Sequence, residues 1–367
     1  MIERGKISIR QFMVLTLLFV IGDAIILAPS HVIISAKQDG WISAWIGVGE
    51  ALLLAVMYSL LGKRFPQQTL VEYSEQVWGR WLGKGISFLF ITYIFIDCAL
   101  MTYEAGDFLT IHFLMGTPIE MTISLFLLVV VLATRLGIET IARTSELLYP
   151  WVWILFLILI VSLFPQVEME NFQPILAEGF SPILKGNVYF LANVLELVIL
   201  LMIFPYVNQP GKARKPYVAG MVIGTSVLAV ISMMTIAVLG ATVASIQQYP
   251  TYILAKKISI GDFLERVEAI VAIMWLFTLF MKISICFYAS TLGLAQLFRL
   301  NDYRPLTFPL GIIAVALSLV LIPNPAFFNY THTIWFPYSA TFALLLPVLT
   351  LVLSAVRKRW FPIKKGM

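Results

Sequence analysis

Ten apolar runs dominate this sequence and constrain its fold more than any motif does. An α-helix needs roughly 20 apolar residues to cross the hydrocarbon core of a bilayer, and the runs are of that size. The composition agrees, because 60% of the 367 residues are hydrophobic and only 12% are charged, whereas soluble domains have about 25% charged residues. The sequence therefore predicts an all-helical, multi-pass membrane protein with ten spans at 9–35, 41–62, 85–111, 119–135, 145–164, 186–208, 216–243, 263–297, 306–323 and 333–356.

The Lys and Arg residues orient these spans, because cytoplasmic loops of membrane proteins carry an excess of both. With the amino terminus inside, most of the 25 basic residues fall in cytoplasmic segments. Lys282 lies within a span, and only five basic residues fall outside: Lys37, Lys185, Lys256, Lys257 and Arg266. We expect both termini to be cytoplasmic. The net charge of +5 then reflects this bias and predicts no nucleic-acid partner.

Motifs for catalysis or metal binding are missing from the sequence. It contains no CxxC, HExxH, GxxxxGK[ST] or GxSxG pattern. Cys98 and Cys286 lie deep in predicted spans, so a disulfide between them is not expected. The three histidines are too scattered to predict a metal site: His31, His112 and His332. We expect no enzymatic activity and no cofactor.

The proline-containing segment 165–185 divides the chain into halves of five spans each. We expect a single membrane domain over residues 1–367, with five-helix repeats at 9–164 and 186–356 joined by this extracytoplasmic loop. Because five is odd, the second repeat must be inverted relative to the first. Inverted repeats are common in secondary transporters, whose binding sites are formed by broken helices near the middle of the membrane.

Two spans carry candidate breaks at matching positions of the two halves. In the first span, Gly22-Asp23-Ala24 interrupts an apolar run, and Pro29 follows. In the sixth span, Asn193 and Glu196 are polar residues in mid-span, whereas Pro205 lies near the cytoplasmic end. We predict a break in both spans, with the stronger sequence signal in the first.

Ionisable residues inside the spans are the strongest functional signal. A lone charge at the bilayer centre costs roughly 2.5–3.5 kcal/mol on insertion scales, so such residues must face the interior, pair with one another or be neutral. Six residues qualify: Asp23, Glu50, Asp97, Glu104, Glu196 and Lys282. Tyr93 and Asp107 lie on the same helical stripe as Asp97 and Glu104. The acids outnumber the single lysine, so either some carboxyls are protonated or water reaches them.

The structural alternatives differ between these residues. Glu50 lies near a face of small residues at 43, 47, 51, 55 and 59, which suits close helix packing, and a structural hydrogen bond is the simpler role. Glu104 and Asp107 lie toward the outer end of their span and could reach interfacial water. Asp23, Asp97, Glu196 and Lys282 lie deepest, where the alternative to a functional site is a buried ion pair that fixes helix packing.

Several short segments resemble the B-subunit, or spore permease, family of spore germinant receptors, a branch of the amino acid–polyamine–organocation transporters. They occur in order along nearly the whole chain: Asp39-Gly40-Trp41, Thr117-Pro118, Gln173-Pro174-Ile175-Leu176-Ala177-Glu178-Gly179, Glu196, Phe204-Pro205-Tyr206-Val207, Tyr249-Pro250-Thr251 and Gly261-Asp262-Phe263-Leu264-Glu265-Arg266-Val267-Glu268. The resemblance implies a LeuT-type fold in a bacterial cell membrane or spore inner membrane. It also implies a nutrient ligand, commonly an amino acid, and a complex with a larger A subunit and a lipoprotein C subunit.

Together, these arguments predict a substrate site of Gly22, Asp23, Ala24, Tyr93, Asp97, Asn193, Glu196 and Lys282, with Asp23, Lys282 and Glu104 as ion-pair or coupling residues. The family tends to have Gly-x-Gly in the first span, whereas this sequence has Gly22-Asp23-Ala24. The Cβ of Ala24 would crowd the backbone amides that receive a ligand carboxylate. The charge of Asp23 would repel that carboxylate. We expect Lys282 to pair with Asp23 in place of a bound cation. A nutrient receptor is the favoured function. A proton-coupled amino-acid transporter is the alternative, and a channel component is a third class.

Overall fold

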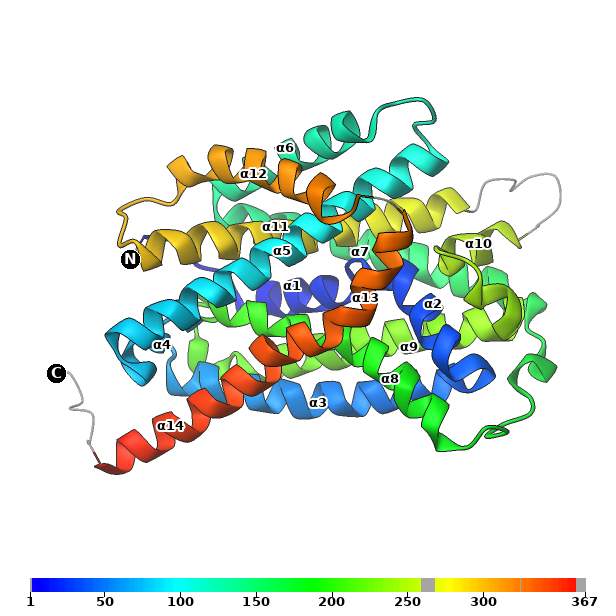
Figure 1. Ribbon diagram of the computed structural model, residues 1–367, viewed down its shortest axis with the longest axis horizontal. Helices are drawn as coiled ribbons and strands as arrows, with labels where there is room; N and C mark the ends of the chain where they lie inside the picture. The colour runs from blue at the N-terminus through cyan, green and yellow to red at the C-terminus, as the bar shows by residue number, and fades with distance from the viewer. Residues whose placement is uncertain (1, 259–267, 324, 361–367) are drawn as a thin grey trace.

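A computed structural model describes residues 2–258, 268–323 and 325–360. The regular elements within these ranges are helices, most of which run along one axis of the bundle (Figure 1). The first half of the chain holds α1 (Ile9–Ile21), α2 (Ala24–Ala36), α3 (Gly40–Arg64), α4 (Leu70–Trp78), α5 (Arg80–His112), α6 (Ile119–Leu136) and α7 (Ile138–Leu163).

The second half begins with α8 (Phe180–Leu195), which continues directly into the 3₁₀ helix η4 (Glu196–Met202). It then holds α9 (Arg214–Ser245), α10 (Pro250–Lys256), α11 (Glu268–Leu297), α12 (Arg304–Leu321), α13 (Pro325–Ala340), the π-helical segment η8 (Thr341–Leu345) and α14 (Leu346–Trp360).

Nine helical segments of the described chain are long and apolar enough to cross a membrane, and α1 is a shorter apolar helix. They account for the ten predicted spans, because the first of the nine joins α2 to α3 through the short turn Lys37–Asp39. The multi-pass, all-helical prediction is therefore confirmed. Two predictions lie outside the described residues. They are positions 261–267 of the last segment that resembles the spore permease family, and the predicted start of the eighth span at 263.

Some predicted boundaries were wrong because hydropathy detects only the apolar part of a helix. The fifth span was predicted from residue 145, but α7 begins at Ile138, just after Gly137 with its φ of 90°. The polar first two turns of α7 extend beyond the apolar run. Between the predicted spans 41–62 and 85–111 lies a further helix, α4, whose start is capped by Thr69 and Glu72.

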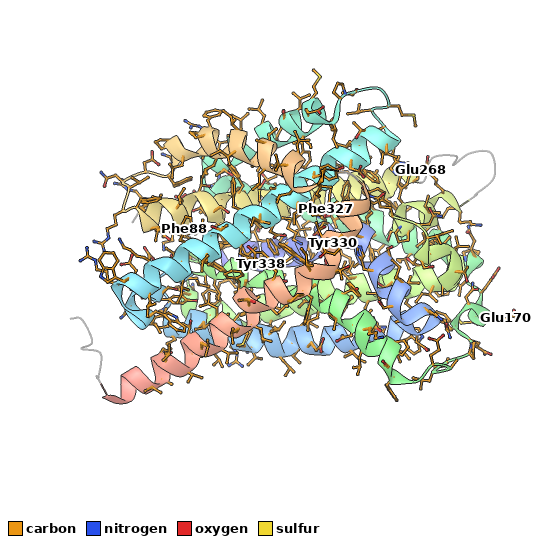
Figure 2. The ribbon with its side chains drawn as sticks, in the orientation of Figure 1. Phe88, Glu170, Glu268, Phe327, Tyr330 and Tyr338 are labelled. Atoms are coloured by element: carbon orange, nitrogen blue, oxygen red, sulfur yellow. The ribbon has the colours of Figure 1, made fainter. Side chains whose placement is uncertain are left out.

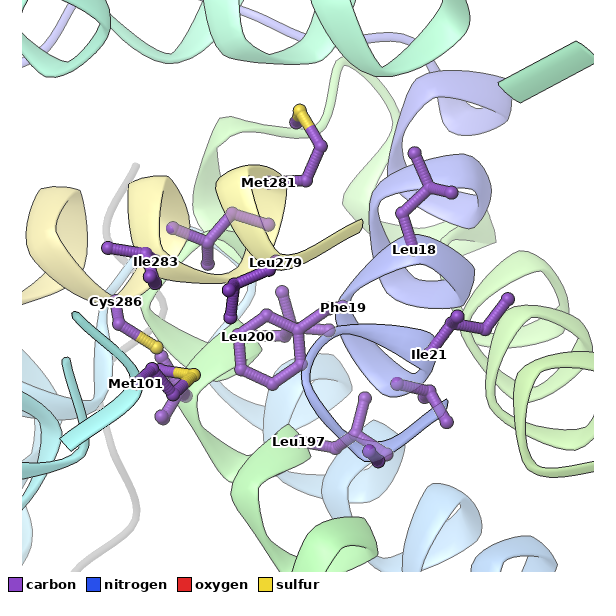
Figure 3. Close-up of a cluster of buried hydrophobic side chains, with 14 of the residues drawn as sticks. Leu18, Phe19, Ile21, Met101, Leu197, Leu200, Leu279, Met281, Ile283 and Cys286 are labelled. Carbon is purple, nitrogen blue, oxygen red and sulfur yellow. The ribbon is translucent and has the colours of Figure 1, made fainter. Parts of the chain in front are cut away.

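The core surrounds α1, which is central in the bundle and packs against α7, α9 and α11. Its side chains are almost fully buried from Val14 onward. Figure 3 shows Phe19 of α1 beside Leu200 of η4 and Leu279 of α11. The two predicted broken spans therefore meet in the middle of the molecule, and α11 lies against both.

The outer surface is suited to lipid. Large apolar side chains are exposed along the helices, among them Leu53 at 70%, Val161 at 68% and Ile312 at 72%. Exposed apolar area on this scale requires an apolar solvent or a partner. Polar side chains mark the ends of the bundle, and Glu170 and Glu268 lie at the same end (Figure 2), the one predicted to be extracytoplasmic.

Candidate functional site

The first span breaks where its sequence predicts. Helix α1 ends at Ile21, Gly22 has a φ of 23°, and α2 begins at Ala24. Glycine suits this position for two reasons: L-residues rarely adopt positive φ, and a Cβ here would lie 2.3 Å from Cδ of Lys282.

The carbonyl groups freed by this break are not left unpaired. The Thr278 hydroxyl donates to the Gly22 carbonyl oxygen at 2.9 Å, and Trp275 Nε1 donates to the Asp23 carbonyl oxygen at 3.3 Å. Both donors come from α11. A helix can break inside a membrane only when neighbours satisfy the backbone in this way.

The sixth span changes geometry at Glu196. Helix α8 ends at Leu195, and the chain continues as a seven-residue 3₁₀ helix, which is longer than the usual three or four residues. The Tyr217 hydroxyl donates to the Leu197 carbonyl oxygen at 3.0 Å. The break thus lies at the polar pair Asn193 and Glu196, well before Pro205.

Lys282 joins the two broken spans. Its ammonium contacts Oδ1 of Asp23 and Oε2 of Glu196, and its side chain is only 1% exposed. It also lies 5.4 Å from the centre of the Phe19 ring. One buried cation therefore connects α11 both to the break after α1 and to the start of η4. Because two carboxylates share this cation, the cluster is acidic overall unless a proton or a ligand balances it.

Trp335 completes the contacts of Glu196. Its indole Nε1 donates to Oε1 of Glu196 at 2.6 Å. Both oxygens of the Glu196 carboxylate are thus engaged, one by Lys282 and the other by α13. Charge-assisted hydrogen bonds of this kind are roughly twice as strong as neutral ones.

Two further acids from α5 lie around the same space. The Cys286 thiol donates weakly to Oδ2 of Asp97, with a separation of 3.7 Å. Oε2 of Glu104 is buried and has no hydrogen-bond partner among the described residues. A buried polar atom without a partner requires an explanation, and an acceptor oxygen in a cavity is a place for a donor from a ligand, water or proton.

A small cavity lies between these groups. It is lined from α2, α5, α8, η4 and α13, and its polar lining consists of Asp23, His31, Asp97, Glu104, Asn193, Glu196, Thr331 and Trp335. The space open to a water-sized sphere is about 30 Å³. A single water needs roughly 10–15 Å³ by the same measure, so the cavity has room for about two or three waters, and a larger ligand requires side chains to move.

Most of the predicted site residues gather here, but not all of them line the cavity. Asp23, Asp97, Glu104, Asn193 and Glu196 do, and Lys282 contacts two of them. Tyr93 instead stacks behind the cavity wall, with its ring 5.7 Å from that of Trp335. Gly22 and Ala24 form the backbone of the break. Their roles in ligand binding remain predictions.

Glu50 and Asp107 lie elsewhere. Asn187 Nδ2 donates to Oε2 of Glu50 at 3.0 Å, between α8 and α3. Oδ2 of Asp107 accepts hydrogen bonds from the Tyr249 hydroxyl at 2.6 Å and from Gln248 Nε2 at 3.2 Å. Neither residue lines the central cavity.

Sequence reasoning missed His31, Thr331 and Trp335. His31 was considered only as a metal ligand, yet Asp23, Leu27 and His31 are four residues apart and line the cavity together. That spacing puts them on one helical face, so following it from Asp23 would have found His31. Thr331 and Trp335 have the same spacing, but no ionisable residue marked their face.

Comparison with known proteins identifies the family. The family model of spore germination proteins named Spore_permease matches residues 6–326. Spore germination protein KB of Bacillus subtilis is 28% identical over 330 residues, which cover 88% of this chain and 87% of that protein. Spore germination protein YndE of the same organism is also 28% identical, with coverage of 97% and 98%.

Solved structures with the same fold include a transporter. MhsT in complex with L-phenylalanine superposes with a TM-score of 0.70 at 15% identity, covering 96% of this chain and 99% of that one. Mhp1, a nucleobase-cation-symport-1 family transporter, also has a TM-score of 0.70, at 13% identity and with 96% and 78% coverage. The fold is of the LeuT type with its inverted repeats, and by the family match this chain is a member of the spore germination protein, or spore permease, family.

Proposed function

We infer that this chain is the nutrient-binding B subunit of a spore germinant receptor and that its ligand, an amino acid, binds in the central cavity. The observation that carries the proposal is the bridge from Lys282 to Asp23 and Glu196, beside a cavity lined by four carboxyl groups. Buried ionisable residues in a membrane protein are functional candidates by default. The proposed role is binding and signalling, with no chemical step.

The charges around the cavity favour a ligand with an ammonium group. Asp23, Asp97, Glu104 and Glu196 line this space, and Lys282 contacts two of them. A ligand ammonium would find acceptors at Asp97 and at the unpaired oxygen of Glu104. A ligand carboxylate would compete with Asp23 and Glu196 for Lys282. Both charged groups of a zwitterionic amino acid would thus find partners of opposite charge around the cavity.

Binding of such a ligand is expected to move helices. The cavity of about 30 Å³ is too small for an amino acid, so entry displaces Trp335 or the Lys282 bridge. A ligand shifts a two-state protein by its differential affinity for the two states. Loosening of the Lys282 bridge changes how α11 holds α1 and η4, and the proposed A and C subunits would transmit that change.

A proton-coupled amino-acid transporter is the second candidate. The transporter folds of MhsT and Mhp1 and the acids around the cavity support it. Flux measurements distinguish the two functions. The receptor proposal predicts that vesicles containing only this chain take up no labelled amino acid against a gradient, whereas net uptake would favour the transporter.

Ligand binding can be tested by thermal unfolding of the purified chain with the twenty common amino acids and their desamino analogues. A ligand at 100 times its dissociation constant stabilises the folded state by about 2.7 kcal/mol. We expect at least one amino acid, but not its desamino analogue, to raise the unfolding temperature. Glu196→Gln and Asp23→Asn should abolish that shift, whereas Glu178→Gln, in an exposed ion pair with Lys37, should retain it. Stabilisation that survives both cavity variants would contradict the proposed site.

A further inference from the structure

An apolar groove runs along the outside of the bundle between α6 and α12, which lie side by side along one edge (Figure 1). Its volume is about 480 Å³, and its walls include Leu127, Leu128 and Val131 from α6 and Ile312, Val315 and Leu319 from α12. The lining also includes Ser124, whose hydroxyl donates to the Glu120 carbonyl oxygen at 2.6 Å. The groove therefore presents an almost entirely apolar surface.

Small residues on α12 give the groove its shape. A Cβ at Gly311 would lie 2.8 Å from Cγ2 of Val131, so glycine lets the two helices approach closely at the floor. Ala316 adds little bulk to the wall, and Ile312 is 72% exposed. The groove is thus open to the lipid side of the bundle.

Two arginines lie at the end of the groove that is predicted to be cytoplasmic. Arg135 Nη1 donates to the Arg304 carbonyl oxygen at 3.0 Å and to the Thr307 hydroxyl at 3.2 Å. Arg304 Nε donates to the Arg135 carbonyl oxygen at 3.1 Å. The Arg135 guanidinium is 4.8 Å from the centre of the Phe308 ring, and Phe308 lines the groove.

These contacts hold the two guanidinium groups in place without using most of their donors. A guanidinium has five N–H donors, and the described hydrogen bonds engage Arg135 through Nη1 and Arg304 through Nε. Two acids lie near them: Asp302 Oδ1 accepts the backbone N–H of Arg304 at 3.1 Å, and Glu3 Oε2 accepts the hydroxyl of Tyr303 at 3.1 Å. The two guanidinium groups are charged and retain a surplus of N–H donors, which suits a phosphate group.

The length of the groove matches one leaflet. The lining residues of α12 extend from Phe308 to Leu319, which at 1.5 Å per residue is about 16 Å. Half of the ~30 Å hydrocarbon core is about 15 Å. An acyl chain whose headgroup lies at the arginines would therefore fill the groove from the membrane surface to the mid-plane.

We propose that this groove, with Arg135 and Arg304, is a specific site for one anionic phospholipid of the cytoplasmic leaflet. The phosphate lies across the two guanidinium groups, and one acyl chain lies between α6 and α12. Basic pockets between membrane helices on the cytoplasmic side bind anionic headgroups in this way. The charge at the end of the groove is what selects this occupant over a neutral lipid or an apolar protein helix.

The test uses the full chain in detergent, titrated with phosphatidylglycerol or phosphatidylcholine, with bound lipid counted by native mass spectrometry. Arg304→Gln removes an exposed charge, Arg135→Gln removes its partner, and Ala316→Phe fills the groove without changing charge. Arg80→Gln is the matched control, because Arg80 is an exposed arginine at the same predicted side, on α5.

We expect one phosphatidylglycerol to bind more tightly than phosphatidylcholine. A basic residue near the surface contributes about 1 kcal/mol, so each arginine variant should weaken binding roughly fivefold. Ala316→Phe should weaken it as well, Arg80→Gln should not, and inorganic phosphate should not compete. The proposal would be overturned if both lipids bound equally, if inorganic phosphate displaced the lipid, or if Ala316→Phe did not weaken binding. It would also be overturned if Ala316→Cys cross-linked to a second protein chain in membranes.

Discussion

Replacing Lys282 by methionine tests whether one ammonium holds the two broken spans together. Lys282 is 1% exposed, and the side chains of Asp23 and Glu196 that it contacts are 10% and 3% exposed. Methionine keeps most of the volume but removes the charge, so two buried carboxylates face each other without a counter-ion. Removing one partner of a buried ion pair typically costs about 3–5 kcal/mol. We expect Lys282→Met to lose at least that much unfolding free energy.

The size of the loss depends on what remains charged. Replacing a whole buried ionic group by neutral residues is often nearly neutral for stability. The triple variant Lys282→Met, Asp23→Asn, Glu196→Gln should therefore recover most of the loss. Unfolding free energies come from denaturant titration of the purified protein in micelles, with Lys63→Met as the control. Lys63 is exposed at the end of α3, so its replacement should change stability by no more than about 0.5 kcal/mol.

Two outcomes would refute this reasoning. If Lys282→Met lost no more stability than Lys63→Met, the ammonium would not compensate the carboxylates. If the triple variant were as unstable as Lys282→Met alone, the loss would come from packing rather than from uncompensated charge.

Two other predictions concern a hydrogen bond at the cavity and the packing of α3 against α8. Trp335→Phe removes the indole donor to Glu196 at 2.6 Å and should lower the unfolding free energy by about 1–3 kcal/mol in the same titration; an unchanged value would mean that this hydrogen bond contributes nothing. Gly47→Ala places a Cβ 2.1 Å from the Phe190 ring, so we expect a loss of about 1–3 kcal/mol from overpacking of α3 against α8. Gly49→Ala, with open space around it, is the control, and equal effects at both glycines would contradict the packing argument.

The spans could be predicted because burial in lipid leaves a strong one-dimensional signal. The break in the first span was visible for a similar reason, since Gly22 and Asp23 interrupt an apolar run. The sixth span was harder. Its only proline, Pro205, lies near the cytoplasmic end, whereas the change at Glu196 is a tightening from α to 3₁₀ geometry that no residue type requires.

The wall of the cavity contributed by α13 could not be predicted. Trp335 and Thr331 lie in a segment whose polar and aromatic residues do not form a clear stripe. Which of them face inward depends on how α13 packs against α8, and that is a property of the assembled bundle. The carboxylates were easier to find, because isolation in lipid is costly for a charge and only one lysine was available to pair with them.

Protection of the cavity by its ligand tests the proposed binding site most directly. Cys98 and Cys286 are both buried and unpaired, and can be replaced to give a cysteine-free background. Asn193→Cys then places a thiol on the cavity wall, and Asn208→Cys places one at an exposed site outside it. The rate of alkylation by a small thiol reagent is measured with and without the amino acid that most stabilises the protein. We predict that the amino acid slows alkylation of Asn193→Cys and leaves Asn208→Cys unchanged; equal rates at Asn193→Cys with and without a stabilising ligand would contradict binding in this cavity.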